Sequence, residues 1–108
     1  MSWTVETLNG TVDAELRALP HDMRARFARI CELIAEFGLE RMEMPHVRRL
    51  AGPLWEMRMS GREGTSRALY VTVRERRVVV VRAFLKKTRR TPKREIALAL
   101  RRAGEISQ

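Results

Sequence analysis

The stretch RALYVTVRERRVVVVRAF, residues 67–84, decides the fold of this chain. Residues 67–73 alternate in the manner of a β-strand, in which successive side chains point to opposite faces. Residues 78–84 form a largely β-branched apolar run, which is typical of a strand covered on both faces. Only residues 74–77 separate the two runs, and so short a connection favours antiparallel pairing. The sequence therefore predicts two adjacent antiparallel strands, the second of them buried.

Two further strands are expected outside this stretch. Residues 54–59 (LWEMRM) alternate, and residues 3–8 (WTVETL) have the β-branched and aromatic composition of a short strand. Asn9 and Gly10 end the first strand. Residues 60–66 are too many for a tight turn, so we expect a flexible loop there.

Apolar residues between the first strand and the others recur at a 4,3,4,3 spacing, which lays them on one helical stripe. They are Val12, Leu16, Leu19, Met23, Phe27, Ile30, Ile34 and Phe37. Pro20 interrupts the stripe, and proline suits the first turn of a helix better than its interior. The pattern therefore predicts two helices, the second ended by Gly38. Residues 39–52 are predicted to form a loop with one helical turn.

A final helix is predicted to start at Thr91, as the N-cap, and Pro92. Its apolar face would contain Ile96, Leu100 and Ala103. The chain thus reads as an α+β protein with one domain over residues 1–108. The expected order is β-α-α-β-β-β-α, with an antiparallel sheet packed on a helical pair.

Composition excludes several classes of protein. The chain has 44% hydrophobic and 32% charged residues, so it is globular rather than disordered. No apolar run approaches the roughly 20 residues that span a bilayer, and no secretory signal is found. We therefore expect a cytoplasmic protein without membrane contact. Cys31 is the only cysteine, and its apolar surroundings predict an inert core residue.

The charge of the chain is large and unevenly distributed. The net charge is +9; residues 1–53 hold 7 basic and 8 acidic residues, whereas residues 54–108 hold 15 and 5. A segregated positive charge favours docking of a polyanion, and nucleic acid is the first candidate. The alternative is that the arginines reflect genome base composition and only solvate the surface.

Arg58 and Arg67 flank the connection between two predicted strands. If they lie opposite each other in the ladder, both guanidinium groups fall on one face of the sheet. Like charges that face each other are destabilising unless an anion lies between them, and the guanidinium fork matches phosphate. The pair therefore indicates a phosphate site, with solvated edge charges as the alternative.

The exit from the buried strand is strongly basic. Residues 86–94 carry six positive charges, including every lysine of the chain. Such density favours phosphate contacts over a merely solvated linker into the last helix. The residues expected to bind nucleic acid are Arg82, Phe84, Arg89, Arg90, Lys93 and Arg94.

Few other side chains suit catalysis. By alternation Tyr70 points to the opposite face of its strand from Arg67, which favours a core position over base stacking. His21 and His46 are the only histidines, and neither has partners at metal-ligand spacing, so no metal site is expected. His46 is a candidate proton-transfer group because histidine titrates near neutral pH. No glycine-rich phosphate loop, serine nucleophile elbow or pair of catalytic carboxylates is found.

Three motifs resemble one known family. LAGPLWEMR (residues 50–58), RALY (67–70) and AFLKKTRRTP (83–92) occur in the order found in the phage-derived, HigB-like branch of the RelE/ParE toxin superfamily. The resemblance implies a compact fold with an antiparallel sheet, a helical pair on one side and a basic concave surface. Relatives of this kind are metal-independent ribonucleases that cleave messenger RNA in the ribosomal decoding site.

The resemblance also implies roles for individual residues. Arg58 and Arg67 would hold the scissile phosphate and stabilise its developing charge. Lys86, with Lys87 beside it, would assist attack by the 2′-hydroxyl, either as base or as electrostatic stabiliser. Several relatives have a histidine or tyrosine near the end of the sheet or in the tail, and the tail of this chain has neither. Either the cationic site needs no dedicated acid, or His46 or Tyr70 supplies the proton.

Two other functions remain open from sequence. A ParE-like toxin would inhibit DNA gyrase without catalysis, and an inactive member would bind only its antitoxin. The expected partners are messenger RNA on the ribosome and a cognate helix-turn-helix antitoxin encoded in the same operon. No cofactor is expected.

Overall fold

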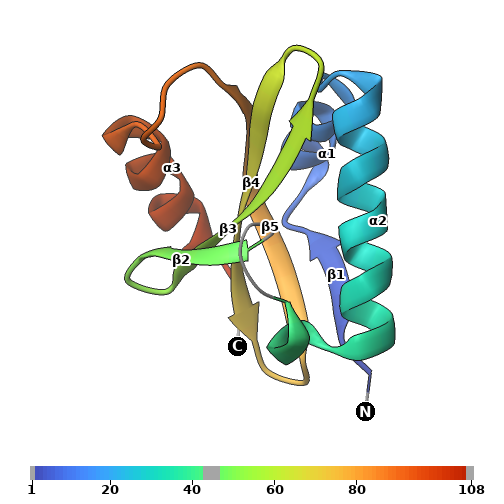
Figure 1. Cartoon of the computed structure of the whole chain (residues 1–108). Helices are drawn as coiled ribbons and strands as arrows, with labels where there is room; N and C mark the ends of the chain where they lie inside the picture. The colour runs from blue at the N-terminus through green and yellow to red at the C-terminus, as the bar shows by residue number, and fades with distance from the viewer. Residues whose placement is uncertain (1, 43–46, 107–108) are drawn as a thin grey trace.

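The computed structural model describes residues 2–42 and 47–106. The described elements, in chain order, are β1 (Thr4–Thr7), α1 (Gly10–Arg17), α2 (His21–Phe37), the 3-10 turn η1 (Leu39–Arg41), β2 (Val47–Ala51), β3 (Leu54–Gly61), β4 (Gly64–Val73), β5 (Arg77–Lys86) and α3 (Lys93–Ala103). They form one α+β unit around a central sheet (Figure 1).

The sheet has the strand order β1-β5-β4-β3-β2. β2 to β5 pair antiparallel, as predicted, but β1 pairs parallel with β5, so the sheet is mixed. β1 therefore lies beside β5, the last strand in the chain, at the opposite edge of the sheet from β2, the next strand in sequence. The buried run of β5 is confirmed, since Val78 and Val80 pack into one core cluster and Val79 and Val81 into the other.

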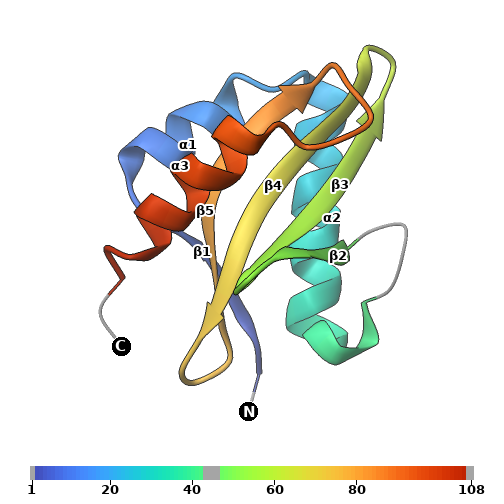
Figure 2. The same ribbon diagram turned by 90° about the vertical axis from the view of Figure 1, so that its left-hand side faces the viewer.

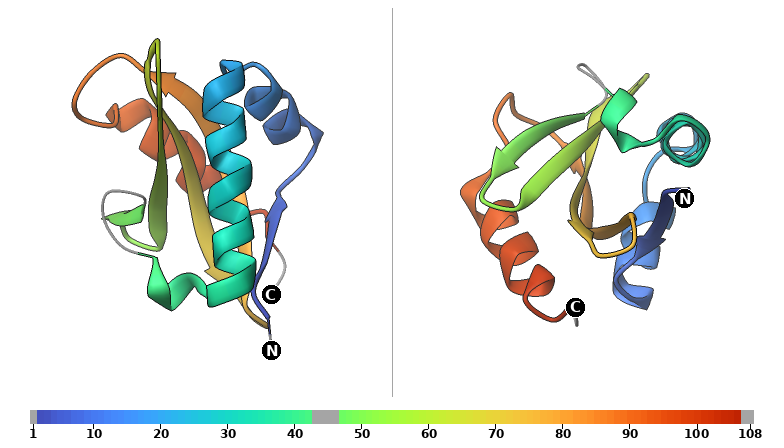
Figure 3. Two further views of the ribbon diagram at one scale, coloured as in Figure 1. Left: turned by 45° about the vertical axis from the view of Figure 1, so that its right-hand side comes forward. Right: turned by 90° about the horizontal axis from the view of Figure 1, so that it is seen from below.

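The two faces of the sheet are covered by different helices, as Figures 2 and 3 show. The stripe of α2 packs on one face through Met23, Ile30 and Ile34, together with Val12 of α1. α3 packs on the other face through Ala99, which is fully buried. Two residues of the predicted stripes fall outside the core: Phe37 is 54% exposed and Leu100 39%.

Two loop predictions were wrong. The segment expected to be only a loop with one helical turn contains η1, as expected, but also the edge strand β2. Its sequence VRRLA lacks alternation because an edge strand buries little of either face. The flexible loop expected at residues 60–66 is instead a tight hairpin in which Gly61 pairs with Gly64. Asp22 at the start of α2 anchors this hairpin by accepting a 2.8 Å hydrogen bond from the backbone N–H of Arg62.

No helix in the described part of the chain is long and apolar enough to cross a membrane.

Candidate nucleic-acid interface

The β3–β4 hairpin and the exit loop after β5 lie at the same end of the molecule, at the top of Figures 1 and 2. A cavity of about 390 Å³ lies between them on the α3 side of the sheet. We call it the cationic cavity. The described residues that line it are Arg58, Gly64, Thr65, Arg67, Lys86, Lys87, Thr88 and Arg89.

Arg58 and Arg67 face each other in this cavity, as the sequence predicts. They are direct partners in the register of β3 and β4. Arg67 is only 4% exposed, and its Nε and Nη1 atoms have no hydrogen-bond partner; nor does Nε of Arg58. Burying charged donors without acceptors is unfavourable. An anion bound in the cavity would supply the missing acceptors.

Lys86 is the last residue of β5 and is 7% exposed. Its Nζ donates a hydrogen bond to the backbone oxygen of Arg89, which holds the amine at the cavity wall. Burial lowers the pKa of Lys86, and the positive charge of Arg67 lowers it further. A larger share of neutral amine is therefore present near neutral pH than in an exposed lysine. Lys87, by contrast, is exposed.

A buried carboxylate beside the cavity was missed in the sequence. Glu56 is fully buried in β3. Its Oε1 accepts a 2.7 Å hydrogen bond from Nε of Arg48, and its Oε2 accepts a 2.8 Å hydrogen bond from Oγ1 of Thr91. Nη1 of Arg67 lies 3.3 Å from Oε1, close enough for an ion pair but without hydrogen-bond geometry. Strand alternation, which places Glu56 on the same face as Arg58, is the signal that could have found it.

The role of Thr91 therefore differs from the predicted one. Pro92, not Thr91, is the N-cap residue of α3, and no side chain caps that helix. The Thr91 hydroxyl is turned to Glu56 because a buried carboxylate needs donors more than the exposed end of a helix does.

A family model described as "Phage derived protein Gp49-like (DUF891)" matches residues 14–104 of this chain. The chain belongs to the phage-derived Gp49-like family. The match confirms the resemblance to the phage-derived branch of the RelE superfamily that the motifs indicate. A search of curated proteins gave no match.

Solved structures show that this Gp49-like protein has the RelE fold. The free state of a double arginine-to-alanine mutant of the E. coli toxin RelE matches with a TM-score of 0.67 and 17% identity, over 94% of this chain and 98% of that one. The archaeal RelE–RelB complex from Pyrococcus horikoshii OT3 matches with a TM-score of 0.55 and 22% identity, over 78% and 94%. At such identities the likeness concerns the fold.

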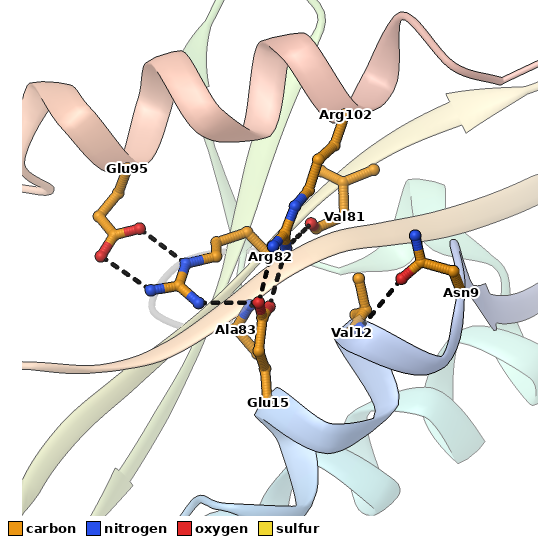
Figure 4. Close-up of polar contacts among 8 residues, drawn as sticks. All are labelled: Asn9, Val12, Glu15, Val81, Arg82, Ala83, Glu95 and Arg102. Atoms are coloured by element: carbon orange, nitrogen blue, oxygen red, sulfur yellow. Dashed lines mark hydrogen bonds and ion pairs between the residues drawn. The ribbon is translucent and has the colours of Figure 1, made fainter.

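Arg82 and Phe84 do not line the cationic cavity of the Gp49-like protein, and their part in nucleic-acid binding stays a prediction. Arg82 donates to Glu95 at 2.7 Å and 3.1 Å, and its Nη1 lies 2.9 Å from Glu15 (Figure 4). Arg102 also binds Glu15, at 2.9 Å. We call Glu15, Arg82, Glu95 and Arg102 the Arg82 network. Phe84 is half-buried beneath the Arg82 guanidinium, whose carbon lies 5.5 Å from the ring centre.

The remaining predicted residues have mixed positions. Arg90, Lys93 and Arg94 are exposed on the exit loop and the first turn of α3, outside the cavity wall. Tyr70 is fully buried in the cluster on the α2 face, which confirms its core position. Burial raises the pKa of its phenol, so it is a poor proton donor for a reaction on the opposite face. His46 lies outside the described residues.

Among the described residues, no three His, Cys, Asp or Glu side chains gather in a way that would hold a metal ion.

Proposed function

We propose that this Gp49-like chain is the toxin of a type II toxin–antitoxin pair and cleaves messenger RNA on the ribosome without a metal ion. The observation that carries the proposal is the convergence of Arg58, Arg67 and Lys86 on one cavity. The proposed substrate, messenger RNA on the ribosome, is inferred from the motifs that resemble those of ribosome-dependent toxins in this superfamily.

The cationic cavity suits a phosphodiester. No carboxylate lines it among the described residues. Its volume of about 390 Å³ is large enough for a phosphate group and the adjoining atoms of the two riboses. Arg58 and Arg67 both line the cavity and both have guanidinium nitrogens without a hydrogen-bond partner, and guanidinium is the side-chain group best suited to phosphate oxygens. No aromatic side chain lines the cavity in the described part of the chain, so the site itself would bind the backbone rather than read bases.

The proposed reaction is a transesterification. Neutral Lys86 accepts the proton of the 2′-hydroxyl, and the 2′-oxygen attacks phosphorus. Arg58 and Arg67 stabilise the negative charge that develops on the non-bridging oxygens. The bond from phosphorus to the 5′-oxygen breaks, and solvent protonates that oxygen. The products are a 2′,3′-cyclic phosphate and a 5′-hydroxyl end. A role for His46 as the acid stays a prediction.

An antitoxin partner follows from the same proposal. We propose that the partner is a helix-turn-helix protein encoded in the same operon. Its acidic residues and an apolar segment of its chain would together cover the cationic cavity. The net charge of +9 favours association with such a partner. The protein would act in the cytoplasm, where ribosomes translate.

The test is translation of a defined message by purified ribosomes with purified protein, followed by mapping of the RNA ends. Cleavage that leaves 2′,3′-cyclic phosphate and 5′-hydroxyl ends in the presence of a metal chelator is the expected result. The chelator must be added after initiation at a concentration that ribosomes tolerate. Intact message at high protein concentration would contradict the proposal, and inhibition of gyrase supercoiling with intact message would select the ParE-like function instead.

A further inference from the structure

Glu56 lies beside the cationic cavity, on the same face of β3 as Arg58, but does not line it among the described residues. Its two oxygens are held by Arg48 at 2.7 Å and by Thr91 at 2.8 Å. These partners come from β2 and from the exit loop two residues before α3, so two other parts of the chain fix this carboxylate of β3. A fully buried carboxylate is stable only with such partners.

The position of Glu56 determines what Arg67 can do. Arg67 is almost fully buried and faces Arg58 directly across the ladder. Glu56, 3.3 Å from Nη1 of Arg67, is the acidic group that compensates this charge. Because the contact lacks hydrogen-bond geometry, it leaves Nε and Nη1 of Arg67 without an acceptor. Glu56 therefore offsets the repulsion between the cations while the arginine keeps free donors.

We propose that Glu56, itself fixed by Thr91 and Arg48, is a positioning residue that holds the Arg67 guanidinium ready for a phosphate in the cationic cavity. This inference rests on the proposed ribonuclease function for its kinetic consequences. Glu56 acts through Arg67 and touches no substrate atom. Its loss should therefore lower kcat and phosphate affinity through Arg67 even though the fold persists.

A purely structural role for Glu56 is the competing explanation, because its ion pair with Arg48 also joins β2 to β3. The chain offers a matched control for that role. Glu95 is also a buried carboxylate that binds an arginine at 2.7 Å, but its partner Arg82 lies outside the cationic cavity. Glu56→Gln and Glu95→Gln thus remove the same charge from two comparable ion pairs.

Kinetics on programmed ribosomes separate the two roles. We expect Glu56→Gln to lower kcat about 10²-fold, since a misplacement near 1 Å has that effect, with KM little changed. The charge of Glu56 raises the pKa of Lys86, so the rising limb of the pH–rate profile should move to lower pH in this variant. Glu95→Gln should keep the wild-type kcat and pH profile, although it unfolds at a lower temperature.

A second measurement does not depend on RNA cleavage. In wild-type protein, inorganic phosphate should shift the NMR signal of the Arg67 Nε–H group. In Glu56→Gln the phosphate concentration at the midpoint of this titration should rise about tenfold, which corresponds to the loss of about one charge-assisted hydrogen bond. In Glu95→Gln the midpoint should stay at its wild-type value.

The outcomes distinguish the two proposals. If wild-type protein never cleaves message, the ribonuclease function fails while the phosphate titration still tests Glu56. If Glu56→Gln matches wild type in kcat and in phosphate midpoint, or if Glu95→Gln is impaired equally, the positioning role is overturned. Should Glu56→Gln fail to fold, Thr91→Val removes one of the groups that hold the carboxylate. That variant should lower kcat about tenfold, and a wild-type kcat would overturn the proposal.

Discussion

The cationic cavity and the Arg82 network are built from the same kinds of side chain, yet their charges are balanced differently. In the Arg82 network two arginines meet two glutamates, and the guanidinium of Arg82 is bound by both carboxylates (Figure 4). In the cationic cavity Glu56 is the acidic partner of Arg67 and also binds Arg48. Arg67 keeps two nitrogens, Nε and Nη1, without a hydrogen-bond partner.

This difference separates a structural arginine from one that is available to a ligand. The Arg82 network connects α1, β5 and α3, so its positive charges are neutralised by carboxylates of the same chain. The cationic cavity concentrates positive charge beyond what its carboxylate compensates, and that excess is unfavourable in the absence of an anion. Burial and sequence neighbourhood alone do not reveal this distinction, because Arg67 and Arg82 both lie in strands. The number of carboxylates that pair with each guanidinium group reveals it.

The largest expected effect is the loss of stability in Arg82→Met. This variant leaves Glu15 and Glu95 without their shared cation, and breaking a buried pair in this way costs about 3–5 kcal/mol. Arg82 is partly exposed, with 21% of its side chain accessible, so we expect about 3 kcal/mol, the low end of that range. Chemical denaturation measures the change. A loss below 1 kcal/mol would show that the Arg82 network does not hold α3.

Arg67→Met should have the opposite profile. It removes one of two facing cations, and Glu56 keeps Arg48 and Thr91 as partners, so the free energy of unfolding should stay within about 1 kcal/mol of wild type. Loss of a donor that stabilises transition-state charge should lower kcat about 10²- to 10³-fold. Cleavage on programmed ribosomes and denaturation of the same preparation give both numbers. A variant that keeps its cleavage activity but unfolds at a lower denaturant concentration than wild type would make Arg67 a structural residue like Arg82.

The pH dependence of cleavage tests Lys86. Burial, and then the charge of Arg67, lowers the pKa of Lys86 from its ordinary value of 10.5. Because the base acts as neutral amine, the rate should rise with pH and level off below pH 10.5. Lys86→Arg keeps the positive charge but cannot lose its proton near neutrality. We expect kcat to fall about 10²-fold and the rising limb to vanish.

The control for this variant is Lys93→Arg, which makes the same exchange at an exposed position outside the cavity wall. Nearly full activity of Lys86→Arg would mean that Lys86 is an electrostatic stabiliser rather than the base, which are the two roles left open by the sequence.

The comparison also explains how much could be predicted from the sequence. The strands over residues 54–84 were predictable, because alternation is a local signal. The register of Arg58 with Arg67 entered the sequence analysis only as a condition, because residues 60–66 were expected to form a flexible loop rather than the hairpin that fixes this register. The edge strand β2 was not, since a strand of five residues with one neighbour needs no periodic apolar pattern. The parallel pairing of β1 with β5 joins residues more than seventy positions apart, and no local pattern encodes it.

The candidate site shows the same division. Arg58, Arg67 and Lys86 were predicted from charge and motif, and the structure brings them to one cavity. Arg82 was predicted to bind nucleic acid on the strength of its charge alone. Its carboxylate partners belong to α1 and α3, and only the tertiary fold brings them to β5. Alternation alone could have placed Glu56 on the face of Arg58, but its partners Arg48 and Thr91 come from other elements, and only the tertiary fold shows that they hold its carboxylate.

The smallest expected effect concerns the exposed cations beside the cavity. Arg90 is exposed and lies on the exit loop, so Arg90→Ala should weaken binding of a non-cleavable 2′-O-methyl RNA by a few-fold, whatever its sequence. The slope of log affinity against log salt concentration should fall by about 0.7, the value for one phosphate of a single strand. Arg82→Met should leave this slope unchanged, because the charge of Arg82 is already matched by Glu15 and Glu95. Binding titrations at several salt concentrations measure both slopes. If Arg82→Met lowers the slope as much as Arg90→Ala does, the Arg82 network takes part in RNA binding, and the separation between structural and ligand-binding arginines does not hold.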